Sequence, residues 1–117
     1  MKSILITGAT GFVASHLIPY LAQKDWRFFL ATRHHCSSDR FPAAVTPVTI
    51  GEINNNTNWQ ITLNGIDTII HLAARAHILH DTMSNVEAEF FKVNVQGTAN
   101  LVKQSIAAGV KHFIFIS

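Results

Sequence analysis

Hydrophobic positions along the chain fall into two patterns, short apolar runs and helically spaced stripes. Five short runs rich in β-branched or aromatic residues predict buried strands at 4–6, 26–31, 45–50, 67–72 and 112–116. Apolar residues recur at helical spacing over 12–23, where Pro19 is expected to bend the helix. A second helical stripe covers 86–108 and stops at Gly109, a residue typical of helix C-termini.

The order of these elements predicts the fold class, which is α/β. Strands that alternate with helices or crossovers form a parallel sheet, and right-handed crossovers arrange them in the order 3-2-1-4-5. We therefore predict a Rossmann-type, doubly wound sheet over residues 1–117, the N-terminal part of a domain truncated after strand 5. Pro47 favours an edge position for the third strand. One helical turn is expected at 59–63, before the turn signal Asn64-Gly65.

Composition narrows the classes of function. Hydrophobic residues make up 48% of the chain and charged residues 14%, which indicates a globular core. The nine Lys and Arg residues are scattered and the net charge is +2, so we expect no nucleic-acid partner. We also expect no membrane partner, because no apolar run approaches the ~20 residues of a membrane span. The single cysteine, Cys36, fits a reducing, cytoplasmic location, and the seven histidines form no metal-ligand pattern.

A glycine-rich turn follows the first strand directly and precedes the first helix. It reads Thr7-Gly8-Ala9-Thr10-Gly11-Phe12-Val13-Ala14. The first glycine permits the tight turn, the second lets the backbone approach a pyrophosphate, and the alanine packs the helix on the strand. Free N–H groups at the start of the helix then face the phosphates, with the hydroxyls of Thr7 and Thr10 at the rim. This arrangement predicts a dinucleotide site, and the alternative is a plain strand-to-helix turn.

The tip of the second strand is the position that reads the adenosine ribose. An acidic residue there would accept a hydrogen bond from the 2′-hydroxyl of NAD, but this chain has Thr32-Arg33. Arginine can pair with the 2′-phosphate of NADP, so the sequence slightly favours NADP over NAD. The alternative is that Arg33 lies in solvent or stacks on the adenine.

Four segments together carry a resemblance to a known family. They occur in the family's order and spacing, and they are Ile-Thr-Gly-Ala-Thr-Gly-Phe-Val-Ala-Ser-His-Leu at 6–17, Ile-His-Leu-Ala-Ala at 70–74, Asn-Val-Gln-Gly-Thr-Ala-Asn-Leu at 94–101 and Phe-Ile-Phe-Ile-Ser at 113–117. The chain resembles the N-terminal part of an extended short-chain dehydrogenase/reductase of the NAD-dependent epimerase/dehydratase family. It is most similar to the UDP-glucose 4-epimerase-like enzymes of surface-polysaccharide biosynthesis.

The resemblance extends the predicted NAD(P) site beyond the glycine turn. The candidate cofactor contacts are Gly8, Thr10, Gly11, Phe12, Val13, Thr32, Arg33, Glu52, Ile53, Leu72, Ala73, Ala74, Arg75, Asn94 and Ser117. By resemblance, Glu52 stands where the family usually has an aspartate that holds the adenine. Asn94 would lie under the nicotinamide, and its alternative is a local hydrogen bond within its helix. Ser117 stands just before the family's catalytic Ser/Thr.

The family's catalytic residues are not found in this chain. Proton transfer in the family needs a Tyr-x-x-x-Lys on the helix after the fifth strand. The only tyrosine, Tyr20, has Lys24 at that spacing but belongs to the first helix. We therefore assign no catalytic residue and expect this fragment to be inactive by itself.

The resemblance implies a parent enzyme that acts on a nucleotide sugar as an epimerase or dehydratase. Two alternatives stay open, an NADP-dependent reductase or hydroxysteroid-type dehydrogenase of the same superfamily, and a non-catalytic NADP-sensing regulator. A missing covering helix would expose apolar surface on strands four and five and on the long helix. We therefore expect self-association, as a homo-oligomer or a swapped dimer.

Overall fold

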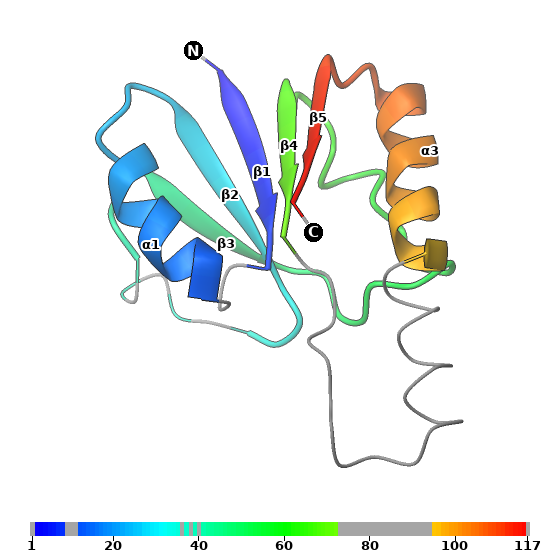
Figure 1. The fold of residues 1–117 in the computed structure, drawn as a ribbon, viewed down its shortest axis with the longest axis horizontal. Helices are drawn as coiled ribbons and strands as arrows, with labels where there is room; N and C mark the ends of the chain where they lie inside the picture. The colour runs from blue at the N-terminus through cyan, green and yellow to red at the C-terminus, as the bar shows by residue number, and fades with distance from the viewer. Residues whose placement is uncertain are drawn as a thin grey trace.

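A computed structural model of the chain describes residues 2–8, 12–35, 37, 39, 41–72 and 95–116, without the side chains of 12–15. Within these residues five strands form one parallel sheet, flanked by helices (Figure 1). The strands are β1 Ser3–Thr7, β2 Arg27–Thr32, β3 Val45–Thr49, β4 Thr68–His71 and β5 His112–Phe115. The helices are α1 Phe12–Leu21 and α3 Thr98–Ala108. The strands lie in the order β3-β2-β1-β4-β5, which confirms the predicted order.

The two faces of the sheet are buried in separate hydrophobic clusters. Ile4 and Ile6 of β1 pack on the side of α1, together with Ile18 of that helix. Leu5, between them in the strand, packs on the other side with Leu101 of α3. Because successive side chains of a strand point to opposite faces, α1 and α3 cover opposite faces of the sheet. The predicted doubly wound architecture is therefore confirmed.

Several boundaries differ slightly from the prediction. β2 begins and ends one residue later than expected, so that Thr32 is its last residue. Residues 95–97 form a wider, π-type turn that leads into α3, while 86–94 of the predicted helix lie outside the described residues. Gly109 adopts a left-handed conformation with φ 82° and ends α3 as predicted. The helix α1 runs through Pro19 without interruption.

The expectations for Pro47 and for residues 59–65 are also met. β3 pairs only with β2 among the described strands, so the strand that contains Pro47 is at the edge of the sheet. The amide of Leu63 donates to the Trp59 carbonyl at 2.9 Å, which closes the expected helical turn. The following Gly65 has a φ of 80°, as a tight turn requires. No described helix has the length and apolar content that crossing a membrane requires.

Exposed apolar side chains lie on β5 and α3, as expected. The exposed ones include Ile114 and Phe115 of β5 and Ile106 of α3. The same expectation is wrong for β4, where Ile69 and Ile70 are buried. Ile69 packs in the cluster on the α3 side and Ile70 in the cluster on the α1 side, so both faces of β4 are covered.

Candidate functional site

The carboxyl ends of the strands meet at one edge of the sheet, where the chain reverses its direction of winding. From β1 the chain continues to β2 and β3 on one side, whereas β4 and β5 lie on the other side. In open α/β sheets ligands bind at such a reversal point, outside the carboxyl ends of the strands. Figure 1 shows the start of α1 at the same edge as the end of β1. The site is therefore sought around β1, β4 and the start of α1.

Gly8, the first residue after β1, has the backbone conformation of the tight turn that the glycine pattern predicted. It has a φ of 82°, which residues with a side chain rarely adopt. A Cβ atom at this position would lie 2.6 Å from the carbonyl oxygen of Leu72 and 2.7 Å from its carbonyl carbon. Two separate constraints, the backbone conformation and the contact with the end of β4, thus require glycine here.

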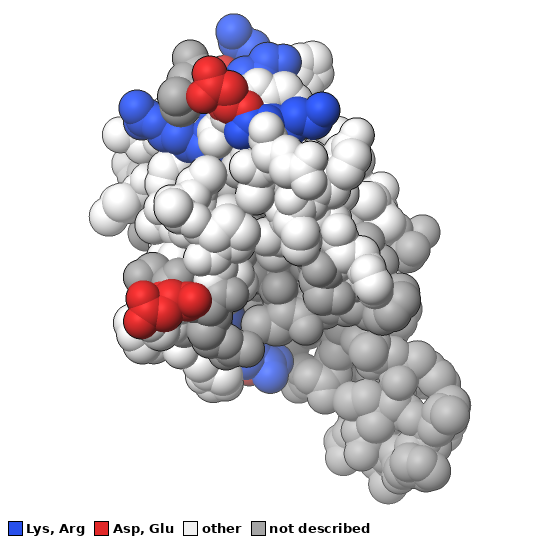
Figure 2. All heavy atoms as spheres, turned by 90° about the vertical axis from the view of Figure 1, so that its left-hand side faces the viewer, with Lys and Arg blue, Asp and Glu red and all other residues white. Residues whose placement is uncertain are grey.

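The start of α1 supplies backbone N–H groups at this edge. The backbone of Phe12 and Val13 forms its first turn, and the free amides and dipole of a helix N-terminus favour an anion. On the face shown in Figure 2, Lys and Arg side chains gather mainly at the opposite end, where the strands begin. The backbone amides at the start of α1 are thus the groups in the described part of the site that could face a phosphate.

The expected role of Thr7 at the rim is wrong. Its side chain is fully buried, and its hydroxyl accepts the amide of Leu72 at 3.1 Å. The same hydroxyl lies 2.6 Å from Nδ1 of His71. Side chains alternate along β1, so Thr7 shares the inward direction of Leu5 and points toward the α3 face.

His71, the last residue of β4, is a functional candidate that the sequence reasoning missed. Its ring is fully buried, with Nε2 2.9 Å from the hydroxyl of Thr98 in α3. The rings of Phe113 and Phe115 have centroids 6.0 and 5.5 Å from that of His71. Burial lowers the pKa of His71 from 6.5 to about 4, so the imidazole is neutral near pH 7. The available signal was a histidine within an otherwise apolar strand.

The two polar residues predicted for the adenosine end lie together. Nη2 of Arg33, just after β2, is 3.1 Å from Oε2 of Glu52, which follows β3. Both side chains are about half exposed, at 49% and 57%. Ile53 is partly buried against the cluster on the α3 side. The hydroxyl of Thr32 donates to the Val48 carbonyl at 3.3 Å, so it is used within the sheet.

The remaining predicted contacts divide into described and undescribed residues. Leu72 is partly buried against the cluster on the α1 side. Its carbonyl group lies close to Gly8 and leaves no room for a Cβ atom there. The predicted contacts that lie outside the described residues are Thr10, Gly11, Ala73, Ala74, Arg75, Asn94 and Ser117. Among the described residues, the structure thus brings Gly8 close to Leu72 and Arg33 close to Glu52.

Tyr20 and Lys24 lie away from this site. Tyr20 belongs to the last turn of α1, whereas the candidate site is at the first turn of that helix. Its ring is 60% exposed, and Nζ of Lys24 lies 5.3 Å from the ring centroid. The matching spacing of these two residues therefore reflects a surface contact.

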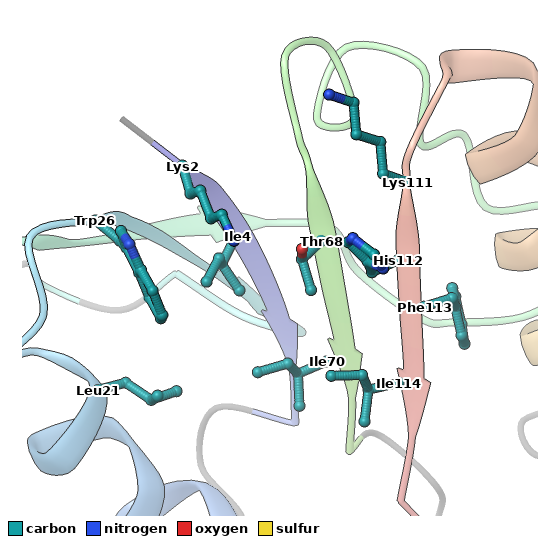
Figure 3. A pocket seen from close by; sticks show the side chains of 10 residues that line it. All are labelled: Lys2, Ile4, Leu21, Trp26, Thr68, Ile70, Lys111, His112, Phe113 and Ile114. Carbon is teal, nitrogen blue, oxygen red and sulfur yellow. The ribbon is translucent and has the colours of Figure 1, made fainter.

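A hollow of about 580 Å³ lies over the α1 face of the sheet, outside the candidate site. Figure 3 shows Ile4, Ile70 and Ile114, from three neighbouring strands, along its floor, with Leu21 at its side. Lys2 and Lys111 line the end where the strands begin. Gly8, the one described glycine of the turn, is not among the described residues that line this hollow, which extends toward the opposite end of the strands.

Comparison with known proteins adds three findings. The model of the NAD dependent epimerase/dehydratase family matches residues 4–117. The chain is 40% identical over 117 residues to a UDP-glucose 4-epimerase of Vibrio cholerae, covering 99% of this chain and 34% of that protein. It is 32% identical over 114 residues to a 3-beta-hydroxysteroid dehydrogenase of Mycolicibacterium neoaurum, covering 96% and 31%. The chain thus spans about a third of the length of these curated relatives.

Solved structures share the fold. MoeE5 in complex with UDP-glucose and NAD superposes with a TM-score of 0.78 and 26% identity, over 97% of this chain and 36% of that one. Yeast methylglyoxal/isovaleraldehyde reductase Gre2, complexed with NADPH, superposes with a TM-score of 0.79 over 97% and 36%. At 16% identity, the second comparison shows the fold alone. Chains of this fold therefore include one with NAD and one with NADPH.

Proposed function

Because the chain belongs to the NAD dependent epimerase/dehydratase family, we propose that it binds NAD(P) at the carboxyl ends of β1, β2 and β4. One observation carries this proposal. Gly8 combines a φ of 82° with a separation from Leu72 that excludes any Cβ atom, four residues before the first residue of α1. This is the backbone arrangement that a pyrophosphate needs.

The residues would hold the cofactor from its adenosine end to its nicotinamide. Amides of the glycine turn and of Phe12 and Val13 would face the pyrophosphate. Arg33 would lie at the adenosine ribose, with Glu52 and Ile53 beside the adenine. Leu72 would line the nicotinamide side. Bound NAD(P) supplies a hydride acceptor or donor, and the protein residues orient it.

The same proposal extends to the residues outside the described part of the chain. On the sequence resemblance, the remaining contacts would come from Thr10 and Gly11 at the pyrophosphate, and at the nicotinamide end from Ala73, Ala74, Asn94 and Ser117. Arg75 is one position from where some relatives have a phosphate-binding lysine.

We further propose that the parent protein acts on a nucleotide sugar as an epimerase or dehydratase. The 40% identity to a UDP-glucose 4-epimerase and the likeness to MoeE5 bound to UDP-glucose support this substrate class. This chain spans about a third of such relatives and contains no Tyr-x-x-x-Lys apart from the surface pair on α1. It would therefore bind cofactor without turning over a sugar nucleotide.

A second candidate is an NADP-dependent dehydrogenase or reductase. The 32% identity to a 3-beta-hydroxysteroid dehydrogenase favours it, and so does an arginine after β2. The pairing of Arg33 with Glu52 weakens the second argument, because the carboxylate competes with a 2′-phosphate for the guanidinium. The epimerase or dehydratase is thus the better supported proposal.

Titration of the ¹⁵N-labelled chain with NADH, NADPH and UDP-glucose, followed by amide chemical shifts, tests cofactor binding. We expect both dinucleotides to shift the amides of Gly8, Phe12 and Val13. Amides at the opposite end of the sheet, such as Asp67 and Lys111, serve as the internal control and should stay unchanged. Saturable shifts confined to the hollow near Lys111, or none with either dinucleotide, would refute the proposed site.

A further inference from the structure

Three side chains, two of them fully buried and one partly buried, form a hydrogen-bonded chain across the point where the sheet reverses. Thr7 ends β1, His71 ends β4, and Thr98 opens α3. Nδ1 of His71 lies 2.6 Å from the Thr7 hydroxyl, and Nε2 lies 2.9 Å from the Thr98 hydroxyl. His71 and Thr7 are also the last paired residues of the two strands. The chain therefore connects three elements directly beneath the proposed cofactor site.

We assign the ring proton of His71 to Nε2, because this tautomer uses the donor and acceptor groups of Thr7 and His71 together. The Thr7 hydroxyl already accepts the Leu72 amide at 3.1 Å, so its own hydrogen is available for an acceptor. Nδ1 takes that hydrogen, which leaves the ring proton on Nε2 to be donated to Thr98. Each ring nitrogen of the neutral imidazole thus has one partner, as a buried polar group requires.

Gly8 and Leu72 connect this chain to the nucleotide side. Thr7 immediately precedes Gly8, and His71 immediately precedes Leu72. The Leu72 amide donates both to the carbonyl and to the hydroxyl of Thr7, each at 3.1 Å. The carbonyl oxygen of Leu72 would in turn lie only 2.6 Å from a Cβ atom on Gly8, so the two backbones are in close contact. A change in the separation of Thr7 and His71 would therefore move the glycine turn.

An ordinary core role explains this histidine poorly. The neighbouring residues Ile69 and Ile70 are apolar and buried, and a leucine or phenylalanine would fill such a position without desolvating two nitrogens. Burial of the imidazole is tolerated because both nitrogens are bonded, at a place where the geometry of two strand ends matters.

We propose that His71 is a positioning residue for dinucleotide binding, which sets the Gly8 turn through Thr7 while Thr98 holds its ring in place. His71 does not touch the nucleotide. The inference rests on the proposed cofactor site and deepens it, because it names the group that keeps the turn in a binding geometry.

Two substitutions separate positioning from stability. In His71→Asn the amide reaches the place of Nδ1 and keeps the bond to Thr7, while the bond to Thr98 is lost. In His71→Gln the amide reaches the place of Nε2, so Thr98 keeps its partner and Thr7 loses one. Both substitutions should lower stability. We expect His71→Asn to keep NADH affinity within about threefold of the wild type and His71→Gln to weaken it about tenfold or more.

Ser105→Ala is the matched control. Ser105 is a buried polar residue of α3 whose hydroxyl bonds to the Leu101 carbonyl of the same helix at 2.6 Å. Its loss should lower stability and leave NADH affinity unchanged. Affinities are compared for the full chain at a temperature where each variant is folded by circular dichroism.

Amide hydrogen exchange without ligand gives a readout that does not depend on cofactor binding. We expect His71→Gln to accelerate exchange at Leu72 more than His71→Asn does, and the ¹⁵N shifts of wild-type His71 to report a proton on Nε2. Equal exchange and equal affinity in the two variants, or a proton on Nδ1, would overturn the positioning role. If the wild type binds no dinucleotide while the Leu72 exchange pattern is as expected, the proposed function fails and the strand-end role of His71 stands.

Discussion

Arg33 and Glu52 share an ion pair at the edge of the sheet that would receive the adenosine ribose. Their side chains are 3.1 Å apart and about half exposed, so the pair is weak in water and open to competition. A 2′-phosphate would have to displace Glu52 from the guanidinium and would also be repelled by its carboxylate. We therefore expect these two residues together to set the balance between NAD and NADP.

Glu52→Gln tests this balance. Without the carboxylate, Arg33 is free to pair with a 2′-phosphate, and we expect the affinity for NADPH relative to NADH to rise about tenfold. The measurement is the pair of dissociation constants, obtained by nucleotide fluorescence. Asp25→Asn makes the same change of charge before β2, at the far end of that strand, and should leave the ratio unchanged. An unchanged ratio in Glu52→Gln as well would contradict a role for Arg33 in selecting NADP.

The buried imidazole of His71 makes stability depend on pH. Its pKa is about 4 in the folded chain and near 6.5 when unfolded, so both states are neutral above pH 6.5. As the pH falls from 6.5 toward 4, the unfolded chain takes up a proton that the folded chain does not. The free energy of unfolding should therefore fall over this range by roughly 3 kcal/mol, with no further contribution of His71 below about pH 4.

Urea unfolding at several pH values between 4 and 7.5 measures this effect. His71→Asn should flatten the dependence, because asparagine does not titrate in this range. The exposed His35, replaced by Gln, provides the control and should leave the slope as it is in the wild type. An identical slope in all three proteins would show that other groups cause the pH dependence.

Two glycines end elements with the same backbone conformation but different surroundings. Gly8 after β1 and Gly109 after α3 both have a φ of 82°. A Cβ added to Gly109 would meet nothing within 4 Å, whereas one added to Gly8 would meet Leu72 at 2.6 Å. The pair therefore separates the cost of the left-handed conformation from the cost of the close contact.

Alanine at each glycine measures the two costs by urea unfolding. We expect Gly109→Ala to lower the free energy of unfolding by about 1 kcal/mol, the cost of placing a Cβ residue in that conformation. Gly8→Ala should cost about 2 kcal/mol more, because the backbone of Leu72 must move away. Equal losses would mean that the end of β1 can shift without strain, and the case for a rigid glycine turn would weaken.

Elements were predictable from sequence where local chemistry decides them. Apolar runs located the five strands, Gly109 ended α3, and the glycine turn followed β1. The contacts between elements were not predictable, because their partners are distant along the chain. His71 is hydrogen-bonded to Thr7, 64 residues away along the chain, and to Thr98, 27 residues away. The prediction for Thr7 was wrong for the same reason. The hydrogen-bond partners of its hydroxyl, His71 and the Leu72 amide, are distant along the chain.

One edge of the sheet, formed by β5, bears on whether molecules of this chain associate in solution. β5 pairs with β4 on one side only within the described chain, and its Ile114 and Phe115 are 47% and 46% exposed. An open strand edge with apolar side chains favours pairing between molecules. We therefore expect concentration-dependent self-association of this chain.

Light scattering after size-exclusion chromatography measures this association. Replacing Phe115 by Lys should shift the population toward monomer, because a charged edge opposes strand pairing. Ile61→Lys changes a more exposed apolar residue, 90% exposed, that lies outside the sheet, and it should have no effect. A wild-type chain that stays monomeric at high concentration would contradict the expectation.

The strand order also dictates when the site can exist during synthesis. β1 emerges first from the ribosome, but its two neighbours in the sheet begin only at Arg27 and Thr68. In a shorter nascent chain β1 can pair with β2, and β2 with β3. The other edge of β1 stays unpaired until β4 has been made. Such long-range parallel pairing is slow because a long loop must close first. The contact between Gly8 and Leu72 at the proposed nucleotide site can therefore form only after β4 has been made.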